Sequence, residues 1–305
     1  MSISIKEIKA LLDSTGMEYE YRGKENLAVE GFSVFSEPKP NTVVWIKNVD
    51  NLYSLGVENK SNLLIIADRS LTDCIVKNHS SILAEHSRSV FFEILNNFFP
   101  PQRQINSIVP TATVETKDVG QNVTIGHNCY ICDGVSIGNN VVIKHNVVIE
   151  CPTVIGNDCI IESGTVIGTA GYGYYELSDK RIRKVPDYGG VSIGNRVEIG
   201  SNVCIARGTL LDTIIDDDVK IDNFCHIAHN VHIGARSYVV AGTIVCGSCK
   251  ICEDAYIAPG AVIMNQKTVG KNAFVGMGAV VTQDVVDNMV VTGYPARPII
   301  TRDKL

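Results

Sequence analysis

Aliphatic residues recur at every sixth position over most of this chain. In the first such row, residues 119–167, all nine positions are Val or Ile. A second row starts at Ile193, slips by four residues near Leu211, and then runs without a break over residues 215–281. An α-helix, with its period of 3.6, does not keep such a row on one face, and an ordinary strand ends after about 5–6 residues. The period predicts a left-handed parallel β-helix with three hexapeptides per coil, whose aliphatic side chains point inward.

Glycine and cysteine follow the same period. Glycine comes directly after five members of the first row, where we expect it to supply the backbone freedom of a corner. Four cysteines fall four positions after a row member, where a small inward side chain fits the core; they are Cys129, Cys159, Cys225 and Cys249. The Cys-x-x-Cys spacings at 129–132 and 246–252 also suit a zinc or redox site. Neighbouring sulfurs in one coil lie on different sides of the wall, however, so we expect core cysteines rather than a tetrahedral metal site.

Residues 1–100 lack the six-residue period and predict a small α/β domain. Apolar residues at helical spacing open it at residues 5–12, and a second helical pattern covers residues 90–95. Between them, residues 42–46 and 62–66 are rich in β-branched and aliphatic side chains and predict strands. A proline pair then ends the second helix, because neither residue continues it.

The rest of the chain divides at two points. We expect the β-helix over residues 101–290, with an inserted segment at 168–192, and a C-terminal tail at 291–305. The insertion has no period of its own and is rich in aromatic and basic residues, and a loop of this length is usually functional or disordered. We expect it to cover a substrate, with Tyr172 and Tyr174 in contact with that substrate.

The composition narrows the classes of protein that remain. The chain has 305 residues, of which 45% are hydrophobic and 20% charged, and its formal net charge is −6. These values exclude a disulfide-stabilised miniprotein and a disordered chain, and no apolar run approaches the roughly 20 residues that span a bilayer. Ten cysteines without a secretory signal indicate reduced thiols and a cytoplasmic location. An acidic chain without a basic stripe is not expected to bind nucleic acid or to insert stably into a membrane.

Three histidines at three-residue spacing stand out in the second row. His226 and His232 each precede a row member, and His229 follows one by two positions, so all three are expected on the outer surface. Gly247 comes one coil, or 18 residues, after His229, and stacked coils would place it about 4.8 Å away. An imidazole beside an unobstructed backbone N–H suits acyl transfer, because the imidazole accepts a proton from the attacking amine and the N–H stabilises the oxyanion. The alternative is a surface histidine next to a corner glycine.

The most distinctive motif is Ile-Ala-His-Asn at residues 227–230, inside the stretch Ile-Asp-Asn-Phe-Cys-His-Ile-Ala-His-Asn-Val-His-Ile-Gly that starts at Ile221. This stretch resembles the UDP-3-O-(3-hydroxyacyl)glucosamine N-acyltransferases of lipid A biosynthesis. Four further segments fit the same resemblance: residues 161–168, 171–174, 191–200 and 212–215. The resemblance covers most of the chain, including the N-terminal domain.

The resemblance implies a catalytic role for three residues. His229 matches the general base of the family, and Asp222, seven residues earlier, matches a carboxylate that assists it. The amide of Gly247 matches the oxyanion hole.

The resemblance also implies a nucleotide site in the N-terminal domain, where the family stacks uracil on aromatic residues. Trp45 and Asn48 are the best matches to that site, with Tyr53 a nearby candidate, although Trp45 is equally compatible with a position in the domain core. In the β-helix, we expect His226 and Asn230 to contact the substrate as well.

Two departures from the family change the expected donor. The family carries a second histidine, whose aligned position is Gln266, expected to line the substrate site. The residues 291–298 resemble the tail of hexapeptide acetyltransferases that use acetyl-CoA, in place of the family's helical extension. We therefore expect a homotrimeric N-acyltransferase that moves a short acyl group from acyl-CoA to the amine of a UDP- or dTDP-linked aminosugar in bacterial surface-glycan biosynthesis, without a bound cofactor or metal. The alternative is the lipid A enzyme itself, with acyl carrier protein as the donor.

Two other classes share the β-helix. A zinc enzyme of the γ-carbonic anhydrase type would use His226, His229 and His232, but we expect their spacing to point them along one wall rather than at one centre. A scaffold or ice-binding β-helix carries regular ladders of threonine, which the sequence lacks.

Overall fold

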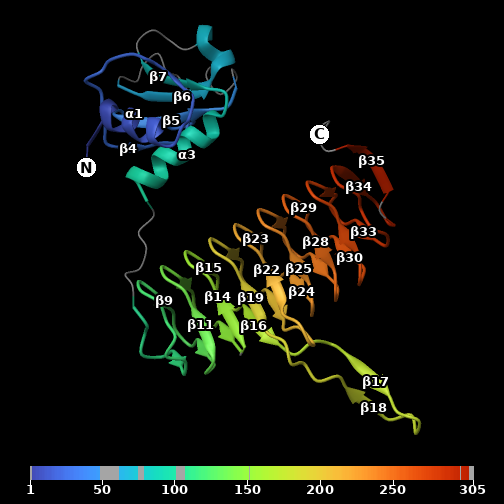
Figure 1. Ribbon diagram of the computed structural model, residues 1–305. Coiled ribbons are helices and arrows are strands. Elements are labelled where there is room, and N and C mark those ends of the chain that lie inside the picture. Colours follow the sequence, from blue (N-terminus) through green and yellow to red (C-terminus); the bar gives the residue numbers. More distant parts are fainter. Residues whose placement is uncertain are drawn as a thin grey trace. The chain divides into compact units, whose positions relative to one another are not determined.

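The computed structural model describes residues 2–48, 62–74, 79–100, 107–150, 152–295 and 297–301. The chain forms two compact units, Met1–Arg103 and Gln104–Leu305, which are described here one at a time (Figure 1). The predicted class, a mainly β chain with a left-handed parallel β-helix and a small N-terminal α/β unit, is confirmed. Tyr53, proposed from the sequence for the nucleotide site, lies outside the described residues.

The N-terminal unit is built on a five-stranded sheet with the order β2-β7-β6-β5-β4. Strands β4 to β7 are parallel, and β2 pairs antiparallel with β7. The elements of this unit are β1 (Ile3–Ser4), α1 (Ile5–Ser14), β2 (Glu20–Arg22), β3 (Ala28–Val29), β4 (Gly31–Phe32), β5 (Thr42–Ile46), β6 (Leu64–Asp68), the 3₁₀ helix η2 (Arg69–Cys74), β7 (Ser80–Ala84) and α3 (Ser87–Phe98).

Local sequence explains where the helices of this unit begin and what they bury. Ser4 caps α1 in a capping box with Glu7, which satisfies backbone donors of the first turn. Ile5, Ile8 and Leu12 then share one buried face, as their helical spacing predicts. Both α1 and α3 pack into one apolar core with alternate residues of the central strands.

Three flat faces of parallel strands form the β-helix. The nine-stranded face contains β8 (Thr113–Val114), β10 (Tyr130–Ile131), β13 (Val148–Ile149), β16 (Val166–Thr169), β21 (Cys204–Ala206), β24 (His226–Ile227), β27 (Ile244–Val245), β30 (Val262–Ile263) and β33 (Val280–Val281). The seven-stranded face contains β11 (Val135–Ile137), β14 (Thr153–Ile155), β19 (Val191–Ile193), β22 (Thr213–Ile215), β25 (His232–Ile233), β28 (Lys250–Ile251) and β31 (Thr268–Val269). The ten-stranded face contains β9 (Thr124–Ile125), β12 (Val142–Ile143), β15 (Ile160–Ile161), β20 (Glu198–Ile199), β23 (Lys220–Ile221), β26 (Tyr238–Val239), β29 (Tyr256–Ile257), β32 (Phe274–Val275), β34 (Met289–Thr292) and β35 (Arg297–Thr301).

The coils stack in register at 18-residue intervals, with two interruptions inside the described helix. Ile155 pairs with Ile193 because a hairpin of β17 (Tyr174–Glu176) and β18 (Ile182–Lys184) is inserted between them. Figure 1 shows this hairpin extending away from the coils. Ile193 pairs with Ile215, 22 residues on, because residues 207–212 contain the four-residue slip. The segment expected to be an unstructured cover thus contains a β-hairpin, whose exposed strands bury no face and so leave no periodic signal.

The row of inward residues forms the core, as predicted. Its Val and Ile members are buried in one continuous cluster together with Cys129, Cys159, Cys225 and Cys249. Burial raises the pKa of these four thiols. The residues expected as a tail contribute β35, which pairs antiparallel with β34 and extends the ten-stranded face.

The glycines after row members do not have the predicted role. The left-handed backbone of the corners is supplied by other residues, such as Asn128 (φ 58°) and Asn146 (φ 57°). A Cβ on Gly138 would lie 2.7 Å from the backbone of Gly156 in the next coil. Glycine is needed there because the coils approach closely, not because the backbone requires a positive φ.

Candidate functional site

A cleft of about 650 Å³ lies along the nine-stranded face and ends at its corner with the seven-stranded face. Strands β21, β24 and β27 supply its wall, and the first residues of the insertion overhang it. The structure brings five of the predicted site residues together here: Tyr172, His226, His229, Gly247 and Gln266.

The His229 ring is held between two glycines. A Cβ on Gly171, at the start of the insertion, would lie 3.0 Å from His229 Cβ and 3.1 Å from its Cδ2. A Cβ on Gly247 would lie 2.7 Å from His229 Nε2. The imidazole therefore occupies the space that a side chain at either position would need, and its Nε2 faces the Gly247 backbone, as the 18-residue spacing predicts.

The Gly247 N–H is an exception in a repeated pattern of hydrogen bonds. At this position of the hexapeptide, the backbone N–H usually donates to a side chain one coil further on, as Asn139 donates to Asn157 Oδ1 at 2.8 Å. The residue one coil beyond Gly247 is Asn265, and among the described residues no acceptor is found for the Gly247 N–H. A free N–H next to an imidazole is the arrangement that an oxyanion hole requires.

Asn230 contacts the ring from the opposite side. Its Nδ2 lies 3.0 Å from His229 Nδ1, and its Oδ1 accepts a hydrogen bond of 2.7 Å from the backbone N–H of Thr209. Both polar atoms of the amide are thus used within the protein. The geometry favours a role in positioning His229 over the predicted direct contact with substrate.

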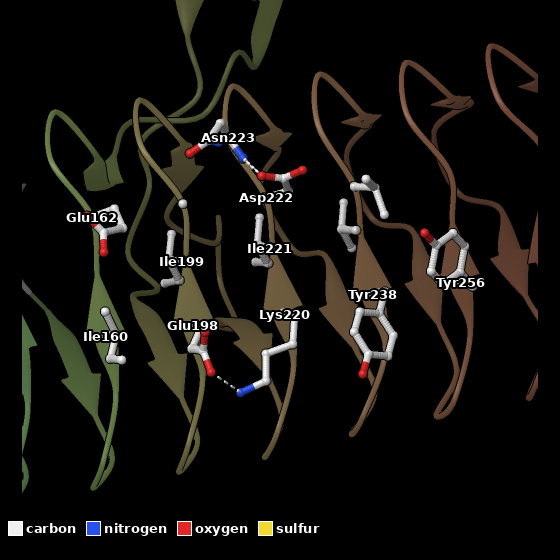
Figure 2. Close-up of a pocket in the computed structure, with 13 residues that line it drawn as sticks. Ile160, Glu162, Glu198, Ile199, Lys220, Ile221, Asp222, Asn223, Tyr238 and Tyr256 are labelled. Atoms are coloured by element: carbon white, nitrogen blue, oxygen red, sulfur yellow. Dashed lines mark hydrogen bonds and ion pairs between the residues drawn. The ribbon is translucent and has the colours of Figure 1, made fainter. Parts of the chain in front are cut away.

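Asp222 lies at a different corner, where the ten-stranded face meets the nine-stranded face. Figure 2 shows it beside Asn223, whose backbone N–H donates to Asp222 Oδ1 at 2.7 Å, while the N–H of Ala241 donates to Oδ2 at 3.2 Å. It lines a second cavity, of about 500 Å³, together with Lys220 and Tyr238. Within one chain, the neighbour of the imidazole Nδ1 is therefore an amide and not this carboxylate.

The other two histidines point in different directions, and the prediction that they share one wall is wrong. His226 lies on the nine-stranded face and His232 on the seven-stranded face, because successive hexapeptides occupy successive faces. His232 Nε2 lies 2.8 Å from Asp216 Oδ2. Desolvation in the cleft lowers the pKa of His226. In the part of the chain that the structure describes, no group of three His, Cys, Asp or Glu residues is arranged to hold a metal ion.

The aromatic residues of the insertion lie at the mouth of the cleft. Tyr172 is 88% exposed and its ring packs edge-on against that of Tyr174, with 5.0 Å between centroids. Lys184 Nζ lies 5.3 Å from the Tyr174 ring and also donates to the Gly171 carbonyl.

The N-terminal candidates lie in the other unit. Trp45 is half-buried on β5; its Nε1–H donates to Ser87 Oγ at 3.1 Å, and its ring stacks on Phe91 with 6.3 Å between centroids. Asn48 is exposed just after β5. Trp45 thus contributes to the domain core while one part of its ring remains accessible.

Asn265 is a residue of the cleft that the sequence reasoning missed. It lies two coils, or 36 residues, beyond His229, in the same column as Gly247. Gln266, which was predicted at the cleft, belongs instead to the column of Asn230, and its N–H donates to the Gly247 carbonyl at 3.0 Å. Counting by coils would have identified Asn265.

Comparisons with known proteins agree with the repeat and the cleft. The bacterial transferase hexapeptide (six repeats) matches residues 118–151, 136–169 and 212–247. UDP-3-O-acylglucosamine N-acyltransferase of Acidovorax sp. is 49% identical over 82 residues, 27% of this chain and 25% of that protein. The protein of the same name from Saccharophagus degradans is 54% identical over 79 residues, 26% of this chain and 23% of that protein. The match thus spans about a quarter of these relatives.

Solved structures extend the likeness over most of the β-helix. UDP-N-acetylglucosamine acyltransferase from Bacteroides fragilis superposes with a TM-score of 0.59 at 25% identity, covering 65% of this chain and 76% of that one. The enzyme of the same name from Campylobacter jejuni gives 0.57 at 25% identity, covering 64% and 75%. The chain carries the hexapeptide repeat of bacterial transferases. Within that class, it resembles in particular the UDP-3-O-acylglucosamine N-acyltransferases. Among the described residues, no helix is long and apolar enough to cross a membrane.

Proposed function

We propose that the protein is an N-acyltransferase that moves an acyl group from a thioester donor to the amine of a UDP-linked aminosugar. The observation that carries the proposal is the pairing of His229 Nε2 with the Gly247 backbone, whose N–H has no acceptor among the described residues. The named relatives favour UDP-3-O-acylglucosamine as the acceptor, and thus the lipid A alternative over the short acyl-CoA reaction expected first.

The proposed chemistry needs one base and one oxyanion site. The amine nitrogen attacks the thioester carbonyl, and His229 accepts the proton that the amine loses. The Gly247 N–H donates to the oxyanion of the tetrahedral intermediate. Collapse of the intermediate then expels the thiolate and leaves the amide product, with the proton on His229 available to the leaving thiol.

Substrate contacts follow from the two units. Trp45 and Asn48, with Tyr53, are proposed to bind the uracil base, since stacking of a base on an aromatic ring contributes about 1–3 kcal/mol. Tyr172 and Tyr174 are proposed to contact the sugar or acyl group at the mouth of the cleft. His226, Asn265 and Gln266 would line the same space. No resident cofactor is required, because the acyl donor is a co-substrate.

We further propose that the protein acts as a homotrimer. Outward side chains on two faces are apolar, such as Ile244 on the nine-stranded face and the stacked rings of Tyr256 and Phe274 on the ten-stranded face. The seven-stranded face carries polar residues instead, such as Lys250. The two apolar faces meet at a corner where Phe224 is 67% exposed, which suits a three-fold axis along that corner.

Purified protein with a matrix of donors and acceptors tests the function. Hydroxyacyl-acyl carrier protein, hydroxyacyl-CoA and acetyl-CoA are each combined with UDP-3-O-acylglucosamine, and with UDP- and dTDP-aminosugars that lack the 3-O-acyl group. We expect amide formation with acyl carrier protein and the acylated UDP-sugar. Turnover only with acetyl-CoA and an unacylated aminosugar would replace this proposal with the short-chain reaction. No turnover in any combination would overturn it.

A further inference from the structure

Asn230 connects His229 to the four-residue slip in the β-helix. Its backbone has a positive φ of 59° and its N–H donates to Thr213 Oγ1 at 3.0 Å, which fixes the residue at the corner. Its side chain then lies between His229 Nδ1 and the backbone N–H of Thr209. Thr209 is fixed in turn by its carbonyl, which accepts a hydrogen bond of 2.7 Å from the Tyr188 N–H at the foot of the hairpin.

The Thr209 contact determines which end of the Asn230 amide faces the ring. A backbone N–H only donates, so the atom 2.7 Å from it is the amide oxygen and the atom facing His229 is the NH₂ group. An NH₂ group donates, so Nδ1 of the neutral imidazole must accept. The single proton of the neutral ring then resides on Nε2, the nitrogen that faces Gly247.

We propose that Asn230 is a positioning residue that selects the tautomer of His229 and holds its proton on Nε2 when no substrate is bound. In this state Nε2 is a hydrogen-bond donor. It becomes a base only when Nδ1 gains a proton from water and Nε2 releases one to water, with the net charge of the ring unchanged. That exchange requires Asn230 to present its oxygen to Nδ1, and so to give up its bond from Thr209. The catalytic consequence rests on the proposed function, but the tautomer does not.

Other charged or titratable groups surround this corner. His226 lies on β24 in the same cleft, and Asp187 and Lys184 bind the backbone of Gly171 at the hairpin foot. Asp212 and His232 line the cavity on the far side of Asn230. None of these groups is among the described hydrogen-bond partners of His229 Nδ1.

The discriminating variant is Asn230→Asp, which keeps the shape of the side chain. One carboxylate oxygen can still accept from the Thr209 N–H, while the other accepts from the ring and so favours a proton on Nδ1. The matched control is Asn128→Asp. Asn128 has the same left-handed backbone (φ 58°) at another corner, where its Nδ2 donates to Asn146 Oδ1 at 3.3 Å.

Long-range ¹H–¹⁵N NMR of histidine-labelled protein reads the tautomer directly, with His229 assigned by its loss in His229→Gln. We expect the Nε2–H form in the wild type and in Asn128→Asp, and the Nδ1–H form in Asn230→Asp. The acidic limb of the kcat/KM profile should move to higher pH in Asn230→Asp only, because a carboxylate beside the ring stabilises the imidazolium.

Two NMR results would overturn the inference: a wild-type ring with its proton on Nδ1, or an unchanged tautomer in Asn230→Asp. If Asn230 were only a structural corner residue, both aspartate variants would lower Tm without a tautomer change. The predicted tautomers in a protein that transfers no acyl group would instead refute the proposed function and leave this inference standing.

Discussion

Gly247→Ala should separate the catalytic arrangement from the fold. The atoms nearest to the new Cβ would be His229 Nε2 at 2.7 Å, Cε1 at 2.8 Å and Cδ2 at 3.3 Å, all in one side chain. Other corner glycines differ, because a Cβ on Gly234 would lie 2.5 Å from the backbone nitrogen of Glu253. A methyl group at Gly247 therefore pushes on the proposed base and on no backbone atom within contact distance.

The size of the effect follows from the required movement. Ordinary van der Waals contact begins near 3.4 Å, so the imidazole must withdraw by about 0.7 Å. A misplacement of about 1 Å in a catalytic group costs about 10²-fold in rate, and we expect kcat to fall by about that factor. If the ring also loses its bond to Asn230, the free energy of unfolding falls by about 1 kcal/mol, which lowers Tm by about 2–4 °C in a unit of this size.

Initial rates with acyl carrier protein donor, calorimetric binding of the UDP-sugar and thermal melts measure the three quantities. We expect a large loss in kcat, nearly unchanged sugar-nucleotide affinity and a small shift in Tm. Gly31→Ala is the control, because the nearest atom to its Cβ is 3.9 Å away and its φ is not positive. Full turnover in Gly247→Ala would refute the placement of Nε2, and a thermal loss as large as that of Gly234→Ala would show that backbone is displaced.

Four further outcomes follow from the geometry. His229→Ala should lower kcat by about 10²–10⁴-fold while sugar-nucleotide binding persists, whereas equal loss in His226→Ala would show that the wrong histidine was chosen. UMP or UDP should quench Trp45 fluorescence, and titration without any quenching contradicts the uracil site. Ile244→Lys should break the trimer in light scattering, while Val154→Lys on the seven-stranded face should not. Because desolvation lowers the folded-state pKa of His226, the unfolded chain binds more protons below about pH 6.5; the stability therefore falls on acidification, and His226→Gln should reduce this fall in Tm.

Periodicity predicted the parts of the fold that repeat. The inward Ile and Val row, the four buried cysteines and the stacking of Gly247 on His229 all follow from counting in sixes and eighteens, because each coil repeats the backbone of the one before. Strand β5 also has the predicted bounds, Thr42–Ile46, since a run of apolar β-branched residues buried on both faces gives a clear signal.

The parts that break the repeat could not be predicted in the same way. The hairpin at Tyr174–Lys184 has no buried face, so its residues show no alternation that a strand would impose. The contact of Asn230 with Thr209 depends on the path of a loop whose residues carry no periodic position. Asp222 was assigned to the base by resemblance, although an interval of seven residues places it beyond one hexapeptide and therefore at another corner.

The position of the proposed site follows from these interruptions. A perfect hexapeptide helix satisfies its corner N–H groups with side chains from the next coil, as at Asn139 and Asn157. It therefore has no free donor to offer a substrate. Loss of one side chain at Gly247 leaves an N–H without an acceptor among the described residues and opens the space that the His229 ring fills. The hairpin foot and the four-residue slip then hold that ring through Gly171 and Asn230. Reactivity in this fold thus arises where the repeat fails, and two insertions bordering one glycine in the otherwise regular column are the pattern to seek in other chains of this kind.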